Sequence, residues 1–396
     1  MKLEDQLKII KFNTVDLLPE EELVEKLKKK NTLRIKYGAD PSRPDLHLGH
    51  YVCLKKLKDL QDLGHHIIFI VGDFTAMIGD PSGRSKTRPR LSKEEVLENS
   101  KTYFEQVFKV LDPEKTEIRY NSEWLSKLTP YQIIELSATY TVSRMLERDD
   151  FKDRFKNNIP ISIHEFLYPL FQAYDSVAIS ADIEVGGTDQ KFNFLVGREV
   201  QQAFGQEPQV ILTVPILEGT DGKLKMSKSY DNYIGITESP DMMFGKVMSI
   251  PDNLMLKYYK LVLYYEDDKL KDIEKRMAEN PRDCKADLAE KIVEIFWGKE
   301  AARAAREEFD RVFKYGGVPD EIPEFVVSSE GMPIIEILAK SGVVSSKSEA
   351  RRLISQKAVK VGDRVILSEF ENIVPGDGLV IKVGKRKFLK VVKSAE

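Results

Sequence analysis

The sequence predicts an α/β protein: a doubly wound parallel sheet, then an α-helical segment and a small α+β module. Two observations favour the sheet. Residues 33 to about 230 alternate short apolar runs with amphipathic patterns of helical period, as parallel strands joined by helices do. The most apolar run, residues 66–71, ends at Gly72 and has the composition of a strand buried on both faces. Binding residues are therefore expected beyond the carboxyl ends of the strands.

Composition narrows the class of protein. The chain has 396 residues, of which 32% are charged and 42% hydrophobic, as in a soluble globular protein of two or three domains. No run reaches the length of a membrane span, and the N-terminal residues lack an apolar signal core, so a cytoplasmic location is expected. Only Cys53 and Cys284 are available, too few for a disulfide framework or a zinc cluster. We expect no metal site and no tightly bound cofactor.

Charge is unevenly distributed along the chain. The net charge is −3, yet residues 335–396 carry 13 lysines and arginines against 7 aspartates and glutamates. A basic C-terminal module on an acidic body indicates a polyanionic partner held at one end.

The chain begins with a charged segment, residues 1–32, which is predicted to be helical. A strand over residues 33–38 leads to the stretch 40–50, in which Asp45 is the predicted N-cap of a helix. His47 and His50 then share one face near the helix start, with no side chain at Gly49 between them. Free N–H groups, two imidazoles and an open backbone suit a nucleotide phosphate and its adenine or ribose. Taken alone, H-x-G-H is equally a turn and a helix that happen to hold two histidines.

A polar loop follows the buried strand at residues 72–88. It combines the acceptors Asp73 and Asp80 with the donors Arg84, Lys86 and Arg88. Asp80 is placed to hold a substrate ammonium, and the basic residues to steer ATP or an RNA 3′ end. The alternative is an ordinary loop rich in glycine and proline. The next stretch, 128–158, is predicted to be largely helical, and its apolar stripe is either core or a subunit interface.

Two further stretches carry polar groups after predicted elements. Tyr168, Gln172 and Asp175 are spaced i, i+4, i+7, so they share one helix face, which lines a polar pocket or forms an exposed edge. A strand at 183–185 then leads into Gly186-Gly187-Thr188-Asp189-Gln190 and a helix over 191–204. The glycines permit a close backbone approach, and Asp189 and Gln190 offer hydrogen bonds to a ribose.

After a strand at 210–212 comes the turn 220–222 and the loop Lys225-Met226-Ser227-Lys228-Ser229. Two lysines on a polar loop can clamp a triphosphate and follow its charge as it moves. By itself such a loop is as well explained as solvated surface.

Together, His47-Leu48-Gly49-His50 and Lys225-Met226-Ser227-Lys228-Ser229 resemble the HIGH and KMSKS signatures of class I aminoacyl-tRNA synthetases. The Y-x-x-x-Q-x-x-D and G-G-T-D-Q stretches narrow the resemblance to bacterial tyrosyl-tRNA synthetases. Residues 332–365, patterned as helix, turn, helix and strand, resemble the small RNA-binding module shared with a ribosomal small-subunit protein. The resemblance covers nearly the whole chain.

This resemblance implies three domains: a Rossmann-like catalytic domain at 1–230, an α-helical anticodon-binding domain at 231–329, and an RNA-binding module at 330–396. The predicted core of the middle domain is Ile292, Val293, Ile295, Phe296 and Trp297. It also implies a tyrosine–tRNA ligase, which activates tyrosine with ATP and Mg²⁺ and transfers it to tRNA(Tyr). The expected assembly is a homodimer. The alternatives are a tryptophan–tRNA ligase, a small adenylyltransferase, or a catalytically silent RNA-binding protein of the same fold.

The family's pattern assigns roles to individual residues. The expected catalytic residues are His47, His50, Lys225, Lys228, Arg84, Lys86 and Arg88. The expected ATP-binding residues are Gly38, Asp40, Ser42, His47, Gly49, His50, Gly187, Asp189, Met226, Ser227 and Lys228. The expected tyrosine-binding residues are Tyr37, Asp80, Tyr168, Gln172, Asp175 and Gln190. The expected RNA-binding residues are Lys347, Arg351, Arg352, Lys385, Arg386 and Lys387.

One position departs from the pattern. Many bacterial relatives have a tyrosine four residues before the aspartate that corresponds to Asp40, and this tyrosine helps to bind the substrate hydroxyl. Here that position is Lys36, with Tyr37 as its neighbour. The partner of the phenol other than Asp175 is therefore left open.

Overall fold

The computed structural model describes residues 1–41, 45–81, 92–313, 322–362, 364–376, 379–384 and 387–394. Within these residues the chain forms two compact units, Met1–Arg303 and Ala304–Glu396. Each unit is treated by itself below.

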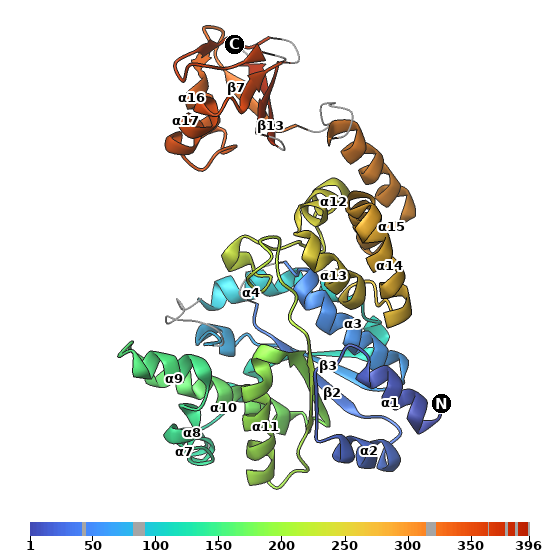
Figure 1. Cartoon of the computed structure of the whole chain (residues 1–396). Coiled ribbons are helices and arrows are strands. Elements are labelled where there is room, and N and C mark those ends of the chain that lie inside the picture. Colours follow the sequence, from blue (N-terminus) through green and yellow to red (C-terminus); the bar gives the residue numbers. More distant parts are fainter. Residues whose placement is uncertain are drawn as a thin grey trace. The chain divides into compact units, whose positions relative to one another are not determined.

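A six-stranded sheet forms the centre of the first unit, in the order β1-β6-β5-β2-β3-β4 (Figure 1). Five strands are parallel, and the edge strand β1 pairs antiparallel with β6. The bounds of the strands are β1 Asp16–Leu18, β2 Arg34–Ala39, β3 His66–Val71, β4 Thr116–Tyr120, β5 Ile183–Gly187 and β6 Val210–Val214. The predicted parallel sheet is confirmed, and the order of the strands reverses between β2 and β5.

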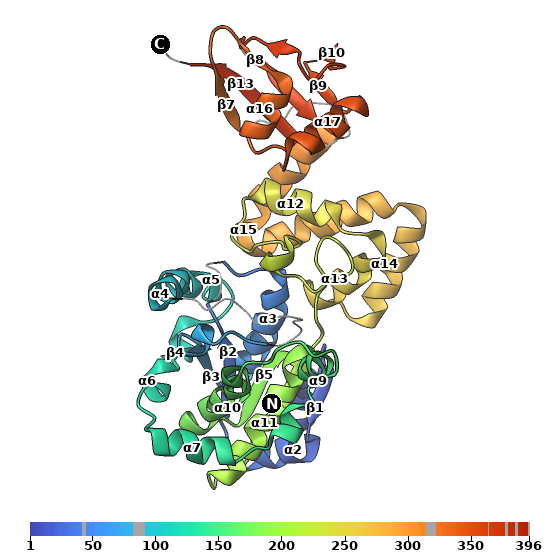
Figure 2. The ribbon, with the colours of Figure 1, turned by 90° about the vertical axis from the view of Figure 1, so that its left-hand side faces the viewer.

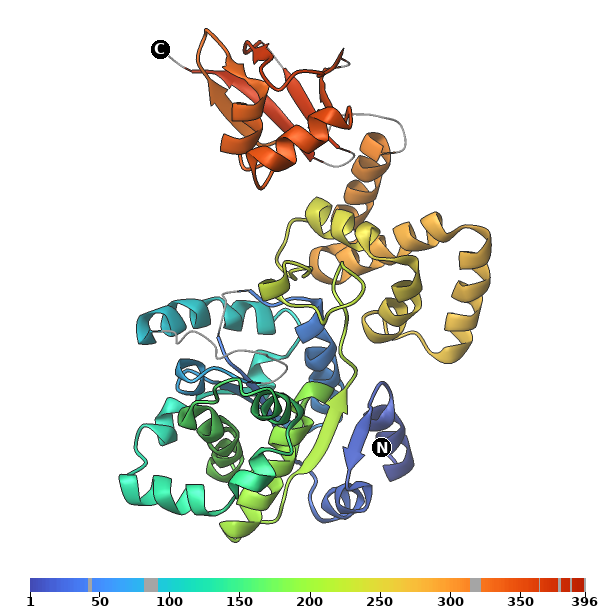
Figure 3. The same ribbon diagram turned by 60° about the vertical axis from the view of Figure 1, so that its left-hand side comes forward.

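Helices cover both faces of this sheet (Figures 2 and 3). The helices of this part of the chain are α1 Leu3–Lys11, α2 Glu20–Lys29, α3 Leu48–Asp62, α4 Lys93–Lys101, α5 Tyr103–Val107, α6 Ser122–Leu125, α7 Pro130–Ala138, α8 Val142–Met145, α9 Asp149–Lys156, α10 Ile163–Ala178 and α11 Lys191–Ala203. Short 3-10 turns occupy Thr75–Met77, Pro113–Lys115, Thr188–Gln190, Lys228–Tyr230 and Asp252–Leu254. Because β2 to β3 and β5 to β6 run in opposite directions across the sheet, right-handed crossovers place α3 and α11 on opposite faces.

The core lies where apolar runs were predicted. Residues 67–71 of β3 are at most 1% exposed, and β6 is buried along its whole length. One prediction was wrong: the segment 1–32 is not wholly helical, because Asp16–Leu18 adds a short edge strand. The helical stretch 128–158 is present as α7, α8 and α9.

A helical segment follows the sheet. Its helices are α12 Pro240–Ser249, α13 Met255–Leu261, α14 Asp267–Glu279 and α15 Pro281–Phe313, and α15 is interrupted at Gly298, where φ is +81°. Of its predicted core residues, Ile292 and Val293 are fully buried, whereas Ile295 and Trp297 are 39% and 40% exposed. Ile295 and Trp297 were therefore wrongly placed in the core.

The second unit ends in a small α+β module. Its elements are β7 Glu324–Val327, β8 Met332–Pro333, α16 Ile334–Lys340, α17 Lys347–Ser355, β9 Val359–Val361, β10 Arg364–Val365, β11 Asn372–Ile373, β12 Val380–Val383 and β13 Lys387–Lys393. One sheet has the order β10-β9-β12-β13-β7, and β11 pairs with β8. A separate apolar core contains Ile334, Ile337, Ala350, Val359 and Ile381. The predicted succession of helix, turn, helix and strand is confirmed.

Candidate active site

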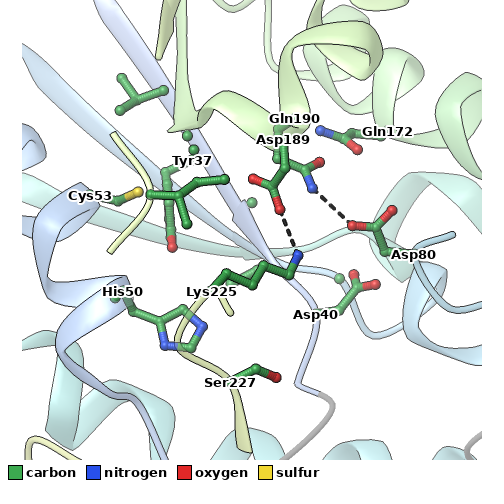
Figure 4. Close-up of a pocket in the computed structure, with 18 of the residues that line it drawn as sticks. Tyr37, Asp40, His50, Cys53, Asp80, Gln172, Asp189, Gln190, Lys225 and Ser227 are labelled. Atoms are coloured by element: carbon green, nitrogen blue, oxygen red, sulfur yellow. Dashed lines mark hydrogen bonds and ion pairs between the residues drawn. The ribbon is translucent and has the colours of Figure 1, made fainter. Parts of the chain in front are cut away.

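A pocket opens beyond the carboxyl ends of β2 and β5, at the point where the strand order reverses (Figure 4). This is the position at which doubly wound sheets bind ligands. The pocket lining includes every expected ATP- and tyrosine-binding residue that the structure describes: Tyr37, Gly38, Asp40, His47, Gly49, His50, Asp80, Tyr168, Gln172, Asp175, Gly187, Asp189, Gln190, Lys225, Met226, Ser227 and Lys228. Ser42, Arg84, Lys86 and Arg88 lie outside the described residues.

The two histidines meet at the start of α3. The helix begins at Leu48 with His47 as its N-cap, so the expected start at Leu46 behind Asp45 was two residues early. The backbone N–H of His47 donates to Nδ1 of His50 at 3.3 Å, and the two ring centroids are 3.9 Å apart. Nδ1 of His47 is buried and has no hydrogen-bond partner among the described residues. A buried polar atom of this kind is available to a ligand.

Gly49 fits closely against the His47 ring. A Cβ at this position would lie 3.0 Å from Cε1 and Nδ1 of His47. The missing side chain therefore allows the imidazole to lie across the first turn of α3.

Burial keeps both imidazoles neutral. It lowers the pKa of His50 to about 4 and the pKa of His47 well below its usual value, and Lys225 and Lys228 lower both further. At neutral pH each ring can donate one N–H to a phosphate oxygen, while the positive charge of the pocket comes from the lysines.

Each lysine of the 225–229 loop pairs with a carboxylate across the pocket. Lys225 Nζ lies 2.8 Å from Oδ2 of Asp189, and Lys228 Nζ lies 2.5 Å from Oδ2 of Asp45 (Figure 4 shows the first pair). Asn232 organises the loop, because it accepts from the Ser227 N–H at 2.8 Å and donates to the Lys225 carbonyl at 3.1 Å. The loop thus holds two ammonium groups towards the space beside the histidines.

Asp40 is held by two hydroxyl groups. Tyr168 donates to its Oδ2 at 3.0 Å, and Thr75 donates to its Oδ1 at 2.8 Å. Tyr168 thus joins α10 to the end of β2.

Asp175 lies at the buried end of the pocket. It accepts from Nε1 of Trp124 at 2.8 Å and from Nδ2 of Asn121 at 3.3 Å. Burial raises the pKa of Asp175 to about 7, and this effect outweighs the opposite pull of Lys36 and of the two hydrogen bonds. A buried carboxylate with spare acceptor capacity suits a phenol hydroxyl.

A chain of amide groups links the polar face of α10 to Asp80. Asn193 donates to Gln172 at 3.0 Å and to Gln190 at 2.9 Å. Gln190 in turn donates to Oδ2 of Asp80 at 2.9 Å (Figure 4). Arg148 also approaches Asp80, at 3.5 Å. Acceptors from three elements therefore converge, as the binding of an ammonium group requires.

Lys36 and Tyr37 point to different surroundings. Tyr37 faces Cys53, Tyr103 and Asp189, and burial raises its pKa well above the usual value. Lys36 is fully buried and pairs with Glu184 at 2.8 Å.

No binding role was predicted for three residues that line the pocket: Asp45, Thr75 and Asn121. Asn121 directly follows β4, so the rule that ligands lie beyond strand ends would have found it had that strand been recognised. Asp45 was predicted only as a helix N-cap, and Thr75 lies in the loop after β3, of which only the charged residues were singled out.

The expected RNA-binding residues lie in the second unit. Lys347 pairs with Glu336, Arg351 lies 2.6 Å from Glu369, and Lys387 donates to the Val343 carbonyl at 2.7 Å. Arg352 is exposed on α17. Lys385 and Arg386 lie outside the described residues.

No helix within the described ranges is both long enough and apolar enough to cross a membrane. In the same part of the chain, His, Cys, Asp and Glu side chains form no group of three or more suited to a metal ion.

Comparisons with known proteins agree with this geometry. Residues 28–314 match the family of class I tRNA synthetases for tryptophan and tyrosine, and residues 332–377 match the S4 domain. Tyrosine–tRNA ligase of Thermotoga maritima is 55% identical over 99% of this chain and 98% of its own length. The Aquifex aeolicus enzyme of the same name is 53% identical over 99% of this chain and 100% of its own length.

A solved structure adds a further match. Tyrosyl-tRNA synthetase from Archaeoglobus fulgidus, complexed with L-tyrosine, superimposes with a TM-score of 0.64 at 26% identity, over 77% of this chain and 100% of that one. The family model alone covers both tryptophan and tyrosine enzymes, whereas these relatives are named for tyrosine. The chain therefore belongs to the tyrosine–tRNA ligase family of class I aminoacyl-tRNA synthetases.

Proposed function

We propose that this chain activates tyrosine with ATP and transfers it to the 3′ end of tRNA(Tyr). One observation carries the proposal: a single pocket gathers the two histidines of α3, the two lysines of the 225–229 loop and the polar face of α10. In the first step a tyrosine carboxylate oxygen attacks the α-phosphorus of ATP. The bond from that phosphorus to the bridging oxygen breaks, and pyrophosphate leaves. A hydroxyl of the terminal ribose then attacks the carbonyl carbon and AMP leaves.

The activation step needs charge neutralisation and alignment rather than a general base, because the carboxylate is already a nucleophile. His47 and His50 donate to phosphate oxygens, and Lys225 and Lys228 follow the charge onto pyrophosphate. Mg²⁺ enters with ATP as part of the substrate. Gly38, Asp40, Ser42, Gly49, Gly187, Asp189, Met226 and Ser227 complete the nucleotide site, and Arg84, Lys86 and Arg88 add positive charge.

The tyrosine substrate occupies the side of the pocket lined by α10. Asp80, Tyr168 and Gln172 take its ammonium, Gln190 takes the carboxylate side, and Asp175 accepts from the phenol hydroxyl. Tyr37 is assigned to the same tyrosine site, where it forms part of the pocket wall. Phenylalanine is rejected because it leaves the buried Asp175 without its partner.

The tRNA is held by the rest of the chain. We assign anticodon binding to residues 231–329 and backbone contacts to the module at 330–396, following the catalytic domain at 1–230. Lys347, Arg351, Arg352, Lys385, Arg386 and Lys387 supply cations for phosphates. The match to the S4 domain supports RNA binding by this module.

The assembly is proposed to be a homodimer that acts in the cytoplasm. Helices α7 to α10 expose five large apolar side chains, each more than 60% accessible: Tyr131, Ile134, Val142, Phe155 and Ile163. Exposed apolar surface of this kind is typical of a protein interface. Light scattering of the full chain would measure the mass of the assembly directly.

The decisive experiment is ATP–pyrophosphate exchange with each of the twenty amino acids and no tRNA. Exchange with tyrosine alone is expected. Exchange with tryptophan instead would overturn the assignment of the α10 face, and no exchange with any amino acid would contradict the proposed activation step.

A further inference from the structure

A lysine is buried directly beneath the α10 face. Lys36 lies in the middle of β2, opposite Glu184 of β5 in the parallel register, and both side chains are at most 1% exposed. Their ammonium and carboxylate groups are 2.8 Å apart. Taking two charges out of water is costly, and a buried pair seldom improves on apolar residues of the same volume. The pair therefore calls for a role besides stability.

All three N–H groups of Lys36 are used within the protein. Besides Glu184, Nζ donates to the backbone carbonyl of Gln172 at 2.6 Å and to Oγ of Ser176 at 2.7 Å. An ammonium group has three donors, so none remains for a substrate. Lys36 thus cannot take over the direct phenol contact that a tyrosine makes at this position in many relatives.

Two of the three acceptors of Lys36 lie on the segment of α10 beside the pocket. Gln172 and Ser176 flank Asp175 on that helix. Glu184 also accepts from the Gln172 side-chain amide at 3.3 Å, and its other oxygen accepts from Gln209. The pair therefore holds both the backbone and the side chain of Gln172.

The positive charge of Lys36 also acts on Asp175 and lowers its pKa, against the larger effect of burial. Trp124 of α6 and Asn121 after β4 donate to this carboxyl, and Glu184 of β5 opposes its ionisation. Lys36 of β2 is the group that favours the ionised form by its charge.

We propose that Lys36 is a positioning residue for the tyrosine substrate: with Glu184 it fixes the Gln172–Ser176 segment of α10 and so holds Asp175 in place to accept the phenol hydroxyl. This inference rests on the proposed role of Asp175. Lys36 belongs to the pocket lining, but its three N–H groups are bound to Glu184, Gln172 and Ser176, so it acts through these partners rather than by donating to the substrate.

The test compares two equally buried lysines. Lys56 is also fully buried and donates to the carbonyls of Ile9, Ile10 and Phe12, and it is not part of the pocket lining. Lys36→Met and Lys56→Met each remove one buried ammonium group. We expect Lys36→Met to raise the KM for tyrosine about fivefold or more at pH 7, because a rise of about one unit from a pKa of about 7 lowers the ionised fraction of Asp175 by that factor. The KM for ATP should change less than about twofold in both variants.

The pH profile separates positioning from a general loss of structure. Ionised Asp175 accepts the phenol hydroxyl, so the KM for tyrosine should fall as pH rises through the pKa of this group. Without Lys36 the pKa of Asp175 rises, and the midpoint of this fall in KM should move to higher pH. Glu184→Gln removes the opposing charge and should move that pH downwards. This second variant keeps the proposal testable where Lys36→Met does not fold. Equal behaviour of Lys36→Met and Lys56→Met, or an unchanged pH midpoint in Glu184→Gln, would overturn the proposal.

Asp175→Asn separates the proposed role of Lys36 from the proposed role of Asp175, on which it rests. A raised tyrosine KM in Asp175→Asn, together with an unaltered one in Lys36→Met, would reject the role of Lys36 alone. An unaltered tyrosine KM in Asp175→Asn would reject the phenol assignment on which that role rests.

Discussion

The ammonium group of Lys228 lies 2.5 Å from the carboxylate of Asp45, joining the 225–229 loop to the segment just before α3. Lys228 is only 12% exposed, whereas Asp45 is 44% exposed. Lys228 is assigned to the phosphates of ATP. The carboxylate of Asp45 therefore competes with these phosphates for the Lys228 ammonium group.

Removing this competitor should favour nucleotide binding. We expect Asp45→Asn to lower the KM for ATP roughly two- to fivefold, the range that partly exposed ion pairs contribute. ATP–pyrophosphate exchange at varied ATP measures this value. The matched control is Asp231→Asn, which changes an exposed aspartate two residues beyond the 225–229 loop. A higher KM for ATP in Asp45→Asn would show that Asp45 assists the nucleotide instead.

Loss of the second loop lysine should affect chemistry rather than tyrosine binding. We expect Lys228→Ala to slow exchange about a hundredfold or more, since a preorganised charge on the leaving group is lost. Equilibrium dialysis with labelled tyrosine should show an affinity within about twofold of the parent. Lys223→Ala changes an exposed lysine two residues before this loop and should alter neither quantity. A parallel loss of tyrosine affinity in Lys228→Ala would contradict the assigned role.

Because Gly49 fits closely against His47, we expect Gly49→Ala to affect stability and activity in opposite directions. Gly49→Ala adds a better helix former, which stabilises by up to about 1 kcal/mol, but its Cβ displaces the His47 ring. We expect exchange to fall about tenfold while the melting temperature is kept or raised.

Gly245→Ala in α12 is the matched control, because a Cβ there meets nothing within 4 Å. It should raise stability and leave exchange unchanged. If Gly49→Ala behaved like Gly245→Ala, the close fit at His47 would have no catalytic role.

The strands of the sheet were predictable in proportion to their burial. β3 is recognised because five of its six residues are buried and apolar. A short apolar run of this kind is typical of a strand buried on both faces. β1 has three residues and exists only through its pairing with β6, almost 200 positions away, so no local pattern reveals it. β4 has one buried residue, Thr116, and four partly buried ones, and its sequence Thr-Glu-Ile-Arg-Tyr contains no apolar run.

The candidate site likewise combines residues that local sequence patterns reveal with contacts that only the folded chain creates. Its motif residues were found from local patterns: several follow a strand or open a helix, Tyr168, Gln172 and Asp175 share one helix face, and the 225–229 loop carries two lysines after a turn. The link between Lys36 and Glu184 was not found, since a sequence does not state which positions of β2 and β5 face each other. The amide chain through Asn193 likewise depends on the packing of α11 against α10, which is a tertiary property.

The C-terminal module should matter only for the second step of the reaction. We expect deletion of residues 330–396 to leave tyrosine-dependent exchange within about twofold of the full chain and to weaken tRNA charging. The remaining charging should depend less steeply on salt, because fewer phosphate contacts are made. Unchanged charging, or an unchanged salt slope, would remove the module from tRNA binding.

The last prediction concerns stability and pH at Asp175. Its pKa is about 7 in the folded protein against 3.8 as the ordinary value, so between these pH values the unfolded chain releases a proton that the folded protein keeps. The free energy of unfolding contributed by this group therefore falls as pH rises from about 4 to about 7, and the loss, about 4 kcal/mol, persists above that range.

Asp175→Asn removes this titration while keeping the shape of the side chain. The melting temperature of the variant, measured relative to the parent, should rise between pH 5 and pH 8, because only the parent acquires a buried charge. Other titrating groups, including His50, whose pKa of about 4 lowers stability on the acid side of 6.5, are common to both proteins and cancel in the difference. A difference in melting temperature that stays constant over this range would mean that Asp175 is already ionised at pH 5. Lys36 and the donors Trp124 and Asn121 would then outweigh the burial of the carboxylate.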